Sequence, residues 1–241
     1  MADVLPTSTA WDPEFFKRSE MFAPLARGAQ YFRHCDSWPE LADYNSMSRG
    51  LNLRNAAGLA LVFVAARPKP RGSRRRQVAQ LTQLSYEAQI YQKGEVPTRL
   101  GSWHDFFNAL VWCAYPLTKA ALNQRQIDAA ASSKTRVREQ DRLAMFDEGG
   151  IIQLQGEAAN SADLVFGHAL FEAYMHDQMS VYGMTYTVLH NESPSSSGFP
   201  TKLSIIDAEL ARHVLSGSLW DPTQRPPRAL LSDLKFVRII A

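Results

Sequence analysis

The segment that most restricts the fold is residues 103–115, which reads WHDFFNALVWCAY and runs up to Pro116. Apolar residues lie on every side of a helix drawn through this segment, so the helix is expected to be buried. Its strongly polar side chains are His104, Asp105 and Asn108. Burying such groups without partners costs about 1–3 kcal/mol each, so each must meet a partner or a ligand.

The rest of the chain predicts more helices and a few strands. Helices are expected over residues 12–32, about 38–47, 118–132, 162–178 and 204–216, while residues 81–93 suit a short helix or a strand. Strands are expected over residues 59–66, 184–190 and 230–240, with a hairpin formed by 143–147 and 151–155 around Glu148-Gly149-Gly150. Strands and helices do not alternate strictly. The pattern therefore predicts a helix-rich α+β fold, a single domain over residues 1–241 with a small, mostly antiparallel sheet.

Composition restricts the class of protein but not its function. The chain has 241 residues, 45% of them apolar, and 26 basic against 24 acidic residues. Its longest apolar run, residues 58–66, is far shorter than the roughly 20 residues of a membrane span, so no span is expected. The first ten residues lack the pattern of a secretory signal, and two cysteines without a C-x-x-C spacing exclude a disulfide framework. We therefore expect a cytoplasmic protein.

Two loops stand out by composition. Residues 67–76, from Arg67 to Arg76, hold six basic residues and no acidic one, and two prolines and a glycine prevent regular structure there. This flexible basic loop suits contact with an anionic partner such as nucleic acid, although it has no aromatic residue for base stacking. Residues 192–200 form a second loop, rich in serine, proline and glycine.

Polar residues in apolar helices are the candidates for chemistry. His168 and Glu172 are one helical turn apart and can point at one ion, or simply pair with each other. Asp147 and Glu148 are adjacent carboxylates beside two glycines, and such a pair can bind a cation, act as a base or only form a turn. His104 can act as a ligand, as an acid–base group or as a structural histidine, and Asp105 can close a capping box with Ser102.

A second set of residues suits ligand binding. Arg99 precedes the free N–H groups at the start of the buried helix, an arrangement that favours a phosphate or carboxylate. Asn108 lies one turn after His104 on the same helix face. Lys119 and Asn123 are one turn apart in the next helix. For Arg99, Lys119 and Asn123 the alternative is an ordinary solvated side chain.

These residues lead to two hypotheses about function. In the first, a buried pocket binds a divalent ion, zinc or a similar metal, through His104, Asp147, His168 and Glu172. The protein would then hydrolyse a phosphoester or an amide, with His104, Asp105 and Glu172 as catalytic residues and either carboxylate as the base. A metal-free enzyme would use His104 as its acid–base group. In the second hypothesis, the chain is a binding module in which the same residues form a structural network and the basic loop contacts an anionic partner.

Several blocks of the sequence resemble the bacterial family called domain of unknown function 3025. They are the residues PTR at 97–99, WHDFFNALVW at 103–112, the pattern from Pro116 to KAALN at 119–123, FDE-x-G at 146–150 and FGHAL-x-E at 166–172. Together they span roughly residues 86–172. The resemblance implies a bacterial cytosolic protein with a dedicated single fold and no established reaction. This chain departs from the family at Ser102, where asparagine is usual, and in its last residues. If that tail helps to form a pocket, the pocket of this chain differs from that of the family.

Overall fold

The structure is a computed structural model that describes residues 10–67, 84–131, 138–155, 162–189, 199–219 and 223–236. These residues form eight α-helices and two small sheets, which confirms the predicted helix-rich α+β class. The basic loop lies outside the described residues except for Arg67. The serine-rich loop lies outside them up to residue 198. Within the described ranges, no helix is both long enough and apolar enough to cross a bilayer.

The N-terminal region consists of short turns in place of the long helix expected over residues 12–32. Its elements are η1 (Phe15–Lys17), η2 (Glu20–Leu25), α1 (Ala26–Ala29) and η3 (Gln30–Phe32). Pro24 lies inside η2, and the hydroxyl of Ser19 accepts a bond from the backbone of Met21 at the start of that element. A continuous helix is wrong here because proline removes a helical hydrogen bond and the serine caps a new turn.

The next elements form a small parallel sheet. Helix α2 (Leu41–Gly50) leads to strand β1 (Val62–Ala65), which pairs in parallel with β2 (Glu95–Thr98) after helix α4 (Tyr86–Lys93). The serine at position 85 caps α4, and Gly94 ends it with a left-handed backbone, φ 70°. Residues 86–93 are thus helical, one of the two alternatives for 81–93. Strand β2 was not expected, because a proline such as Pro97 is disfavoured in a strand except at a sheet edge.

Helix α5 (Trp103–Ala114) is the buried helix that the sequence predicted. Phe106, Phe107, Leu110 and Val111 have no exposed surface, and phenylalanines from the N-terminal turns and from α8 pack around them. Helix α6 (Pro116–Ala131) begins directly at the proline that ends α5. Proline suits the first turn of a helix because its missing N–H would have no partner there.

A four-stranded sheet forms the other half of the chain. Helix α7 (Arg138–Gly149) leads into β3 (Gly150–Gln155), followed by β4 (Ala162–Val165), helix α8 (His168–Met175), β5 (Tyr182–Leu189), helix α9 (Phe199–Ser216) and β6 (Arg228–Leu230). The strand order is β4-β3-β5-β6. The β3–β4 and β5–β6 pairs are antiparallel and β3–β5 is parallel. The prediction of one mostly antiparallel sheet therefore fits this sheet only, because β1 and β2 form a second, parallel sheet.

Two predicted elements are wrong in this half, and a third is described only in part. The hairpin of residues 143–147 and 151–155 is absent, because the first segment lies in α7, where Leu143 and Phe146 share a buried helical face. The helix over 162–178 is split at Phe166-Gly167 into β4 and α8. Of the strand expected over 230–240, the described part includes Leu230 at the end of β6 and a β-bridge from Phe236 to Asp163, while residues 237–240 lie outside it.

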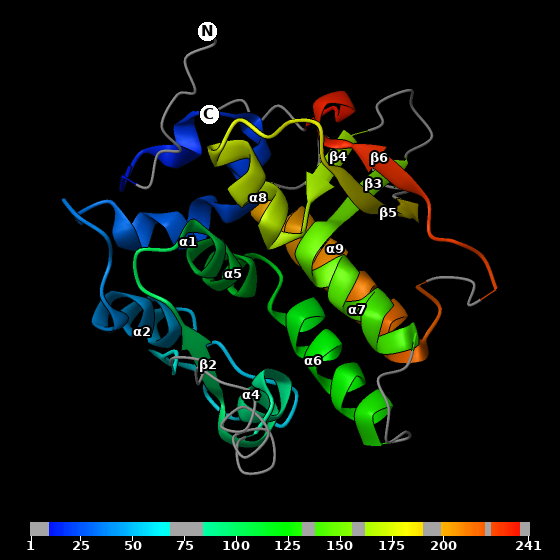
Figure 1. The fold of residues 1–241 in the computed structure, drawn as a ribbon, viewed down its shortest axis with the longest axis horizontal. Coiled ribbons are helices and arrows are strands. Elements are labelled where there is room, and N and C mark those ends of the chain that lie inside the picture. The colour runs from blue at the N-terminus through cyan, green and yellow to red at the C-terminus, as the bar shows by residue number, and fades with distance from the viewer. Residues whose placement is uncertain are drawn as a thin grey trace, which may run out of the picture.

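The helices between the two sheets carry the candidate site. Figure 1 shows the four-stranded sheet at one end of the molecule and α2, β2 and α4 at the other, with α5 and α6 between them. Helix α8 packs against α5, while α6 contacts α4, α7 and α9. Segments far apart in the sequence therefore meet around the first turn of α5.

The start of α6 depends on an acidic side chain from another helix. Asp207 of α9 is 2% exposed and accepts hydrogen bonds from the backbone N–H groups of Leu117 and Thr118, at 2.9 and 2.8 Å. These groups have no partner within α6, because the first N–H groups of a helix have no preceding turn.

Replacing Asp207 by alanine is expected to lower the free energy of unfolding by about 2 kcal/mol, since both N–H groups lose their acceptor. Urea unfolding of Asp207→Ala measures this loss, and Glu209→Ala, on the same helix, should change stability by less than about 0.5 kcal/mol. Equal unfolding midpoints for wild type and Asp207→Ala would show that the cap contributes nothing.

Candidate metal centre

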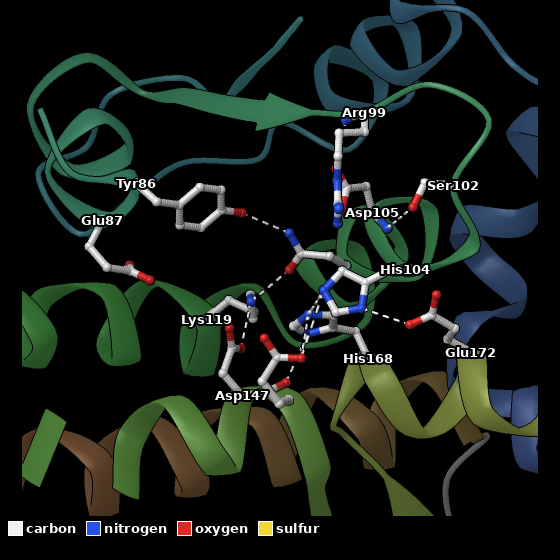
Figure 2. A network of polar contacts seen from close by, with 12 residues as sticks. Tyr86, Glu87, Arg99, Ser102, His104, Asp105, Lys119, Asp147, His168 and Glu172 are labelled. Atoms are coloured by element: carbon white, nitrogen blue, oxygen red, sulfur yellow. Dashed lines mark hydrogen bonds and ion pairs between the residues drawn. The ribbon is translucent and has the colours of Figure 1, made fainter. Parts of the chain in front are cut away.

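Two histidines from different helices meet at the centre of the site. His104 lies in the first turn of α5, and His168 is the first residue of α8. Their ring centroids are 4.5 Å apart, and the two Nε2 atoms are 3.2 Å apart (Figure 2). Packing of α8 against α5 brings these residues together across 64 positions of sequence.

The other nitrogen of each ring is held by an oxygen atom. Nδ1 of His168 donates to the backbone oxygen of Asp147 at 2.8 Å, and Nδ1 of His104 donates to Oε2 of Glu172 at 2.9 Å. A carbonyl oxygen can only accept, so Nδ1 of His168 carries the hydrogen and its Nε2 carries the lone pair. Metal-binding histidines have this arrangement, in which an oxygen acceptor fixes the ring and directs the free nitrogen.

Glu148 supplies a third donor atom beside the two imidazoles. Its Oε2 lies 3.4 Å from Nε2 of His168 and 3.7 Å from Nε2 of His104. One ligand atom from each of the three residues lies within 4.8 Å of the others. Two histidines and one carboxylate are a ligand set used for catalytic zinc and for non-haem iron.

A close backbone contact places Glu148 next to His168. Gly149 and Gly150 join α7 to β3, and Gly167 directly precedes α8. A Cβ atom on Gly167 would lie 2.4 Å from Cα of Gly149 and from N of Gly150, so these segments approach more closely than any larger residue allows. The glycines that suggested a turn therefore let the end of α7 meet the start of α8.

The charge states of the two histidines differ. Burial lowers the pKa of His168 to about 3, so this ring is neutral at neutral pH and offers a lone pair. The hydrogen bond to Glu172 raises the pKa of His104, and the same bond lowers the pKa of Glu172. Burial raises the pKa of Glu148, whose side chain is still 51% exposed.

A buried lysine forms hydrogen bonds with two polar residues beside the histidines. Nζ of Lys119 donates to Oδ1 of Asp147 at 2.5 Å and to Oδ1 of Asn108 at 2.9 Å, and Nδ2 of Asn108 donates to the hydroxyl of Tyr86 at 2.8 Å. Lys119 is 4% exposed and Asn108 is 8% exposed. Burial disfavours an ionised Asp147, but Lys119 outweighs this and lowers its pKa. The side chain of Asp147 thus pairs with Lys119, while its backbone oxygen holds His168.

The network continues along α4 and α6. Asn123, 2% exposed, donates from Nδ2 to Oε2 of Glu87 at 2.6 Å, and Gln126 donates to the other carboxylate oxygen at 3.3 Å. Burial and the neighbouring charge of Asp147 raise the pKa of Glu87 to about 7. The solvated alternative for Lys119 and Asn123 is therefore wrong, since both side chains are buried and bonded.

The raised pKa of Glu87 predicts a pH-dependent stability. Because the folded state holds the Glu87 proton more tightly than the unfolded state, this contribution is present at low pH and is lost as pH rises from about 4.5 to about 7. Glu87→Gln removes this ionisation. Its free energy of unfolding minus that of wild type should therefore be about 2 kcal/mol higher at pH 8 than at pH 5. Urea unfolding of both proteins at these two pH values measures the difference; parallel pH profiles would contradict the prediction.

Arg99 and Asp105 form an ion pair above the histidines. Nε and Nη2 of Arg99 donate to the two carboxylate oxygens of Asp105 at 3.0 and 2.6 Å, and the Arg99 backbone N–H donates to Oδ2 at 2.6 Å. The hydroxyl of Ser102 accepts from the backbone of Asp105 at 3.5 Å, which caps α5. Only half of the expected capping box forms, because the Asp105 carboxylate is directed to Arg99.

These groups surround a cavity of about 990 Å³. Its wall includes the metal-ligand candidates His104, His168 and Glu148, together with Asn108, Asp147, Asp105, Arg99 and Tyr86. The cavity also extends to Lys93 and Arg67. A second hollow of about 1010 Å³ lies on another side of Glu148 and is lined by Glu172 as well. The candidate ligands therefore have access to space for a substrate.

The structure brings most of the candidate residues together but changes their partners. His104, His168 and Glu172 meet, yet Glu172 bonds His104 and not the nearby His168 of its own helix. Glu148, one of the two adjacent carboxylates considered for cation binding but not chosen as a ligand, joins the histidines where Asp147 was expected. The signal that could have singled it out is its helical position, which becomes visible only once residues 138–149 are recognised as a helix.

Comparison with known proteins gives a family of unknown function. Residues 74–164 match the family described as "Protein of unknown function (DUF3025)". No curated protein matches the chain. A solved structure, the apo form of the cold active phenylalanine hydroxylase from Colwellia psychrerythraea 34H, is 10% identical, covers 86% of this chain and 85% of its own, and has a TM-score of 0.41. The chain thus resembles the DUF3025 family over a stretch that contains His104, Lys119 and Glu148 and ends before His168.

Proposed function

We propose that the protein is a metal-dependent hydrolase whose ion binds to Nε2 of His104, Nε2 of His168 and the carboxylate of Glu148. The observation that supports this most is the pair of Nε2 atoms 3.2 Å apart, each on a ring whose Nδ1 is held by an oxygen. Zn–N bonds measure about 2.0–2.1 Å, so small movements of the three side chains admit an ion between them.

The charge balance of the site also supports a cation. The carboxylates of Asp105, Asp147, Glu148 and Glu172 lie in or beside the site. Against them stand the fixed positive charges of Arg99 and Lys119. A divalent ion offsets the excess of negative charge, which otherwise costs free energy in a partly buried place.

In this proposal the surrounding residues have distinct roles. Glu172 and the backbone of Asp147 orient the two imidazoles, as outer partners do in known metal sites. Asp105 holds Arg99 at the cavity, so the base role expected for Asp105 becomes a positioning role. A bound divalent ion would lower the pKa of a coordinated water and polarise the bond to be cleaved, a phosphoester or an amide.

Metal loading followed by substrate screening tests the proposal. The purified protein is stripped with a chelator, loaded with Zn²⁺, Mn²⁺ or Fe²⁺, and assayed with p-nitrophenyl phosphate, bis(p-nitrophenyl) phosphate and an amino-acid p-nitroanilide. We expect hydrolysis of at least one substrate by a loaded form, none by the stripped form, and none by loaded Glu148→Gln. Ion binding without any hydrolysis would reject the hydrolase and leave a metal-binding protein.

A second candidate function is a binding module, favoured by the complete pairing of the two imidazoles. A proton on Nε2 of His104 can be donated to Nε2 of His168, which gives the four ring nitrogens hydrogen-bond partners without an ion. The basic loop would then contact an anionic partner. Chelator treatment separates the two functions, because it should remove activity from an enzyme and leave a structural network unchanged.

A further inference from the structure

One hydroxyl in the cavity retains an unused hydrogen. Lys119 can only donate, so the Asn108 atom that it contacts must be Oδ1, and Nδ2 must face Tyr86. The oxygen of Tyr86 therefore accepts a hydrogen bond, and within the described residues its own hydrogen has no acceptor. Tyr86 is 39% exposed and lines the cavity that contains the two histidines. Its hydroxyl points from α4 toward the site (Figure 2).

Arg99 offers further donors on the same wall. Its bonds to Asp105 use Nε and one hydrogen of Nη2, which leaves Nη1 without a partner among the described residues. The guanidinium is close enough to Glu148 and Glu172 for their charges to raise its pKa, after the larger effect of Asp105. Its side chain is 63% exposed and lines the cavity beside His104.

We propose that Tyr86 and Arg99 bind the oxygen atoms of a phosphate group, so that the substrate of the metal centre is a phosphoester. This rests on the proposed function, because it places the group next to the ion bound by the two histidines and Glu148. The two unused donors come from different elements: Tyr86 begins α4, and Arg99 directly follows β2. They thus approach the cavity from separate directions.

The donors favour phosphate over an amide for two reasons. A phosphate group presents several charged oxygens, whereas an amide carbonyl is neutral and gains little from a guanidinium. The acidic side chains also repel a free anion unless an ion is present, since the fixed positive charges of Arg99 and Lys119 are already paired with Asp105 and Asp147. Phosphate binding should therefore require the loaded metal centre.

Binding of a phosphoester analogue to the metal-loaded protein tests the proposal. The full chain is loaded with Co²⁺, whose visible absorption bands report ligands at the ion, and is titrated with phenylphosphonate and separately with benzamide. We expect phenylphosphonate to bind to the loaded wild type. Its affinity should be about 10-fold lower for Tyr86→Phe, and lower by about 10-fold or more for Arg99→Gln. Lys93→Gln, which removes a positive charge from the same cavity, should stay within about 2-fold of wild type. Circular dichroism and cobalt content confirm that each variant is folded and loaded.

The outcomes distinguish this proposal from the metal centre itself. Failure of the wild type to take up Co²⁺ overturns both. Uptake of Co²⁺ with no binding of phenylphosphonate, or with tighter binding of benzamide, overturns the phosphate site alone. Equal losses for Arg99→Gln and Lys93→Gln also overturn it, because they would show only a general effect of charge.

Discussion

Replacing Lys119 by methionine is expected to lower the free energy of unfolding by about 3–5 kcal/mol. The ammonium group is 4% exposed, pairs with Asp147 at 2.5 Å and donates to Asn108 at 2.9 Å. Its removal leaves the Asp147 carboxylate without a cation in a place that water reaches poorly. An unpaired buried charge costs far more than the packing of a methionine regains.

A double substitution separates the charge effect from packing. Lys119→Met with Asp147→Asn removes both charges, so it should recover at least half of the lost stability. Lys93→Met, on an exposed lysine, should change stability by less than about 0.5 kcal/mol. Urea unfolding measures all three proteins. A loss below about 1 kcal/mol for Lys119→Met would show that the pair is not the buried interaction described above.

The two glutamates near the histidines should differ in their effect on metal affinity. Glu148 lies beside the Nε2 atoms of both histidines, whereas Glu172 bonds Nδ1 of His104, the nitrogen that does not face the ion. Loss of an outer partner such as Glu172 costs about 10–100-fold in affinity. Glu148→Gln should cost more than about 100-fold, because it removes a charged ligand itself.

Competition of Zn²⁺ between the protein and a coloured chelator measures both dissociation constants. Each glutamine variant keeps the size and shape of the side chain, which limits changes in packing. A larger loss for Glu172→Gln than for Glu148→Gln would contradict the assignment and make Glu172 the ligand. Equal affinities for wild type and Glu148→Gln would remove the glutamate from the centre.

The sequence predicted the polar groups of the site because burial demands partners for them. Helix α5 is apolar on all sides, so His104 and Asn108 had to meet polar atoms, and they do. The same reasoning did not extend to Lys119, because apolar and polar residues are mixed along α6. Lys119 is buried through the contacts of α6 with other helices. Local periodicity thus identified a buried polar residue in α5, which is uniformly apolar, but not in the mixed pattern of α6.

The sequence did not predict the partners across helices. Residues 147–150 form an Asp-Glu-Gly-Gly run that is typical of a turn, but the apolar spacing of Leu143 and Phe146 makes residues 138–149 a helix. Because Glu148 lies at the end of that helix, its carboxylate is beside His168. Similarly, the pairing of Glu172 with His104 depends on the packing of α8 against α5, which no spacing within α8 can indicate.

Metal content is the most direct test of the central claim. Wild type, His104→Ala, His168→Ala and His34→Ala are each incubated with zinc, dialysed and measured by elemental analysis, with circular dichroism to confirm folding. His34 is the control because, with Cys35 and Asp43, it forms the other cluster of metal-binding side chains among the described residues, although its own side chain is 69% exposed. We predict about one zinc per chain in wild type and His34→Ala, and none in the folded His104→Ala and His168→Ala variants. No zinc in wild type, or equal zinc in all four proteins, would contradict the metal centre.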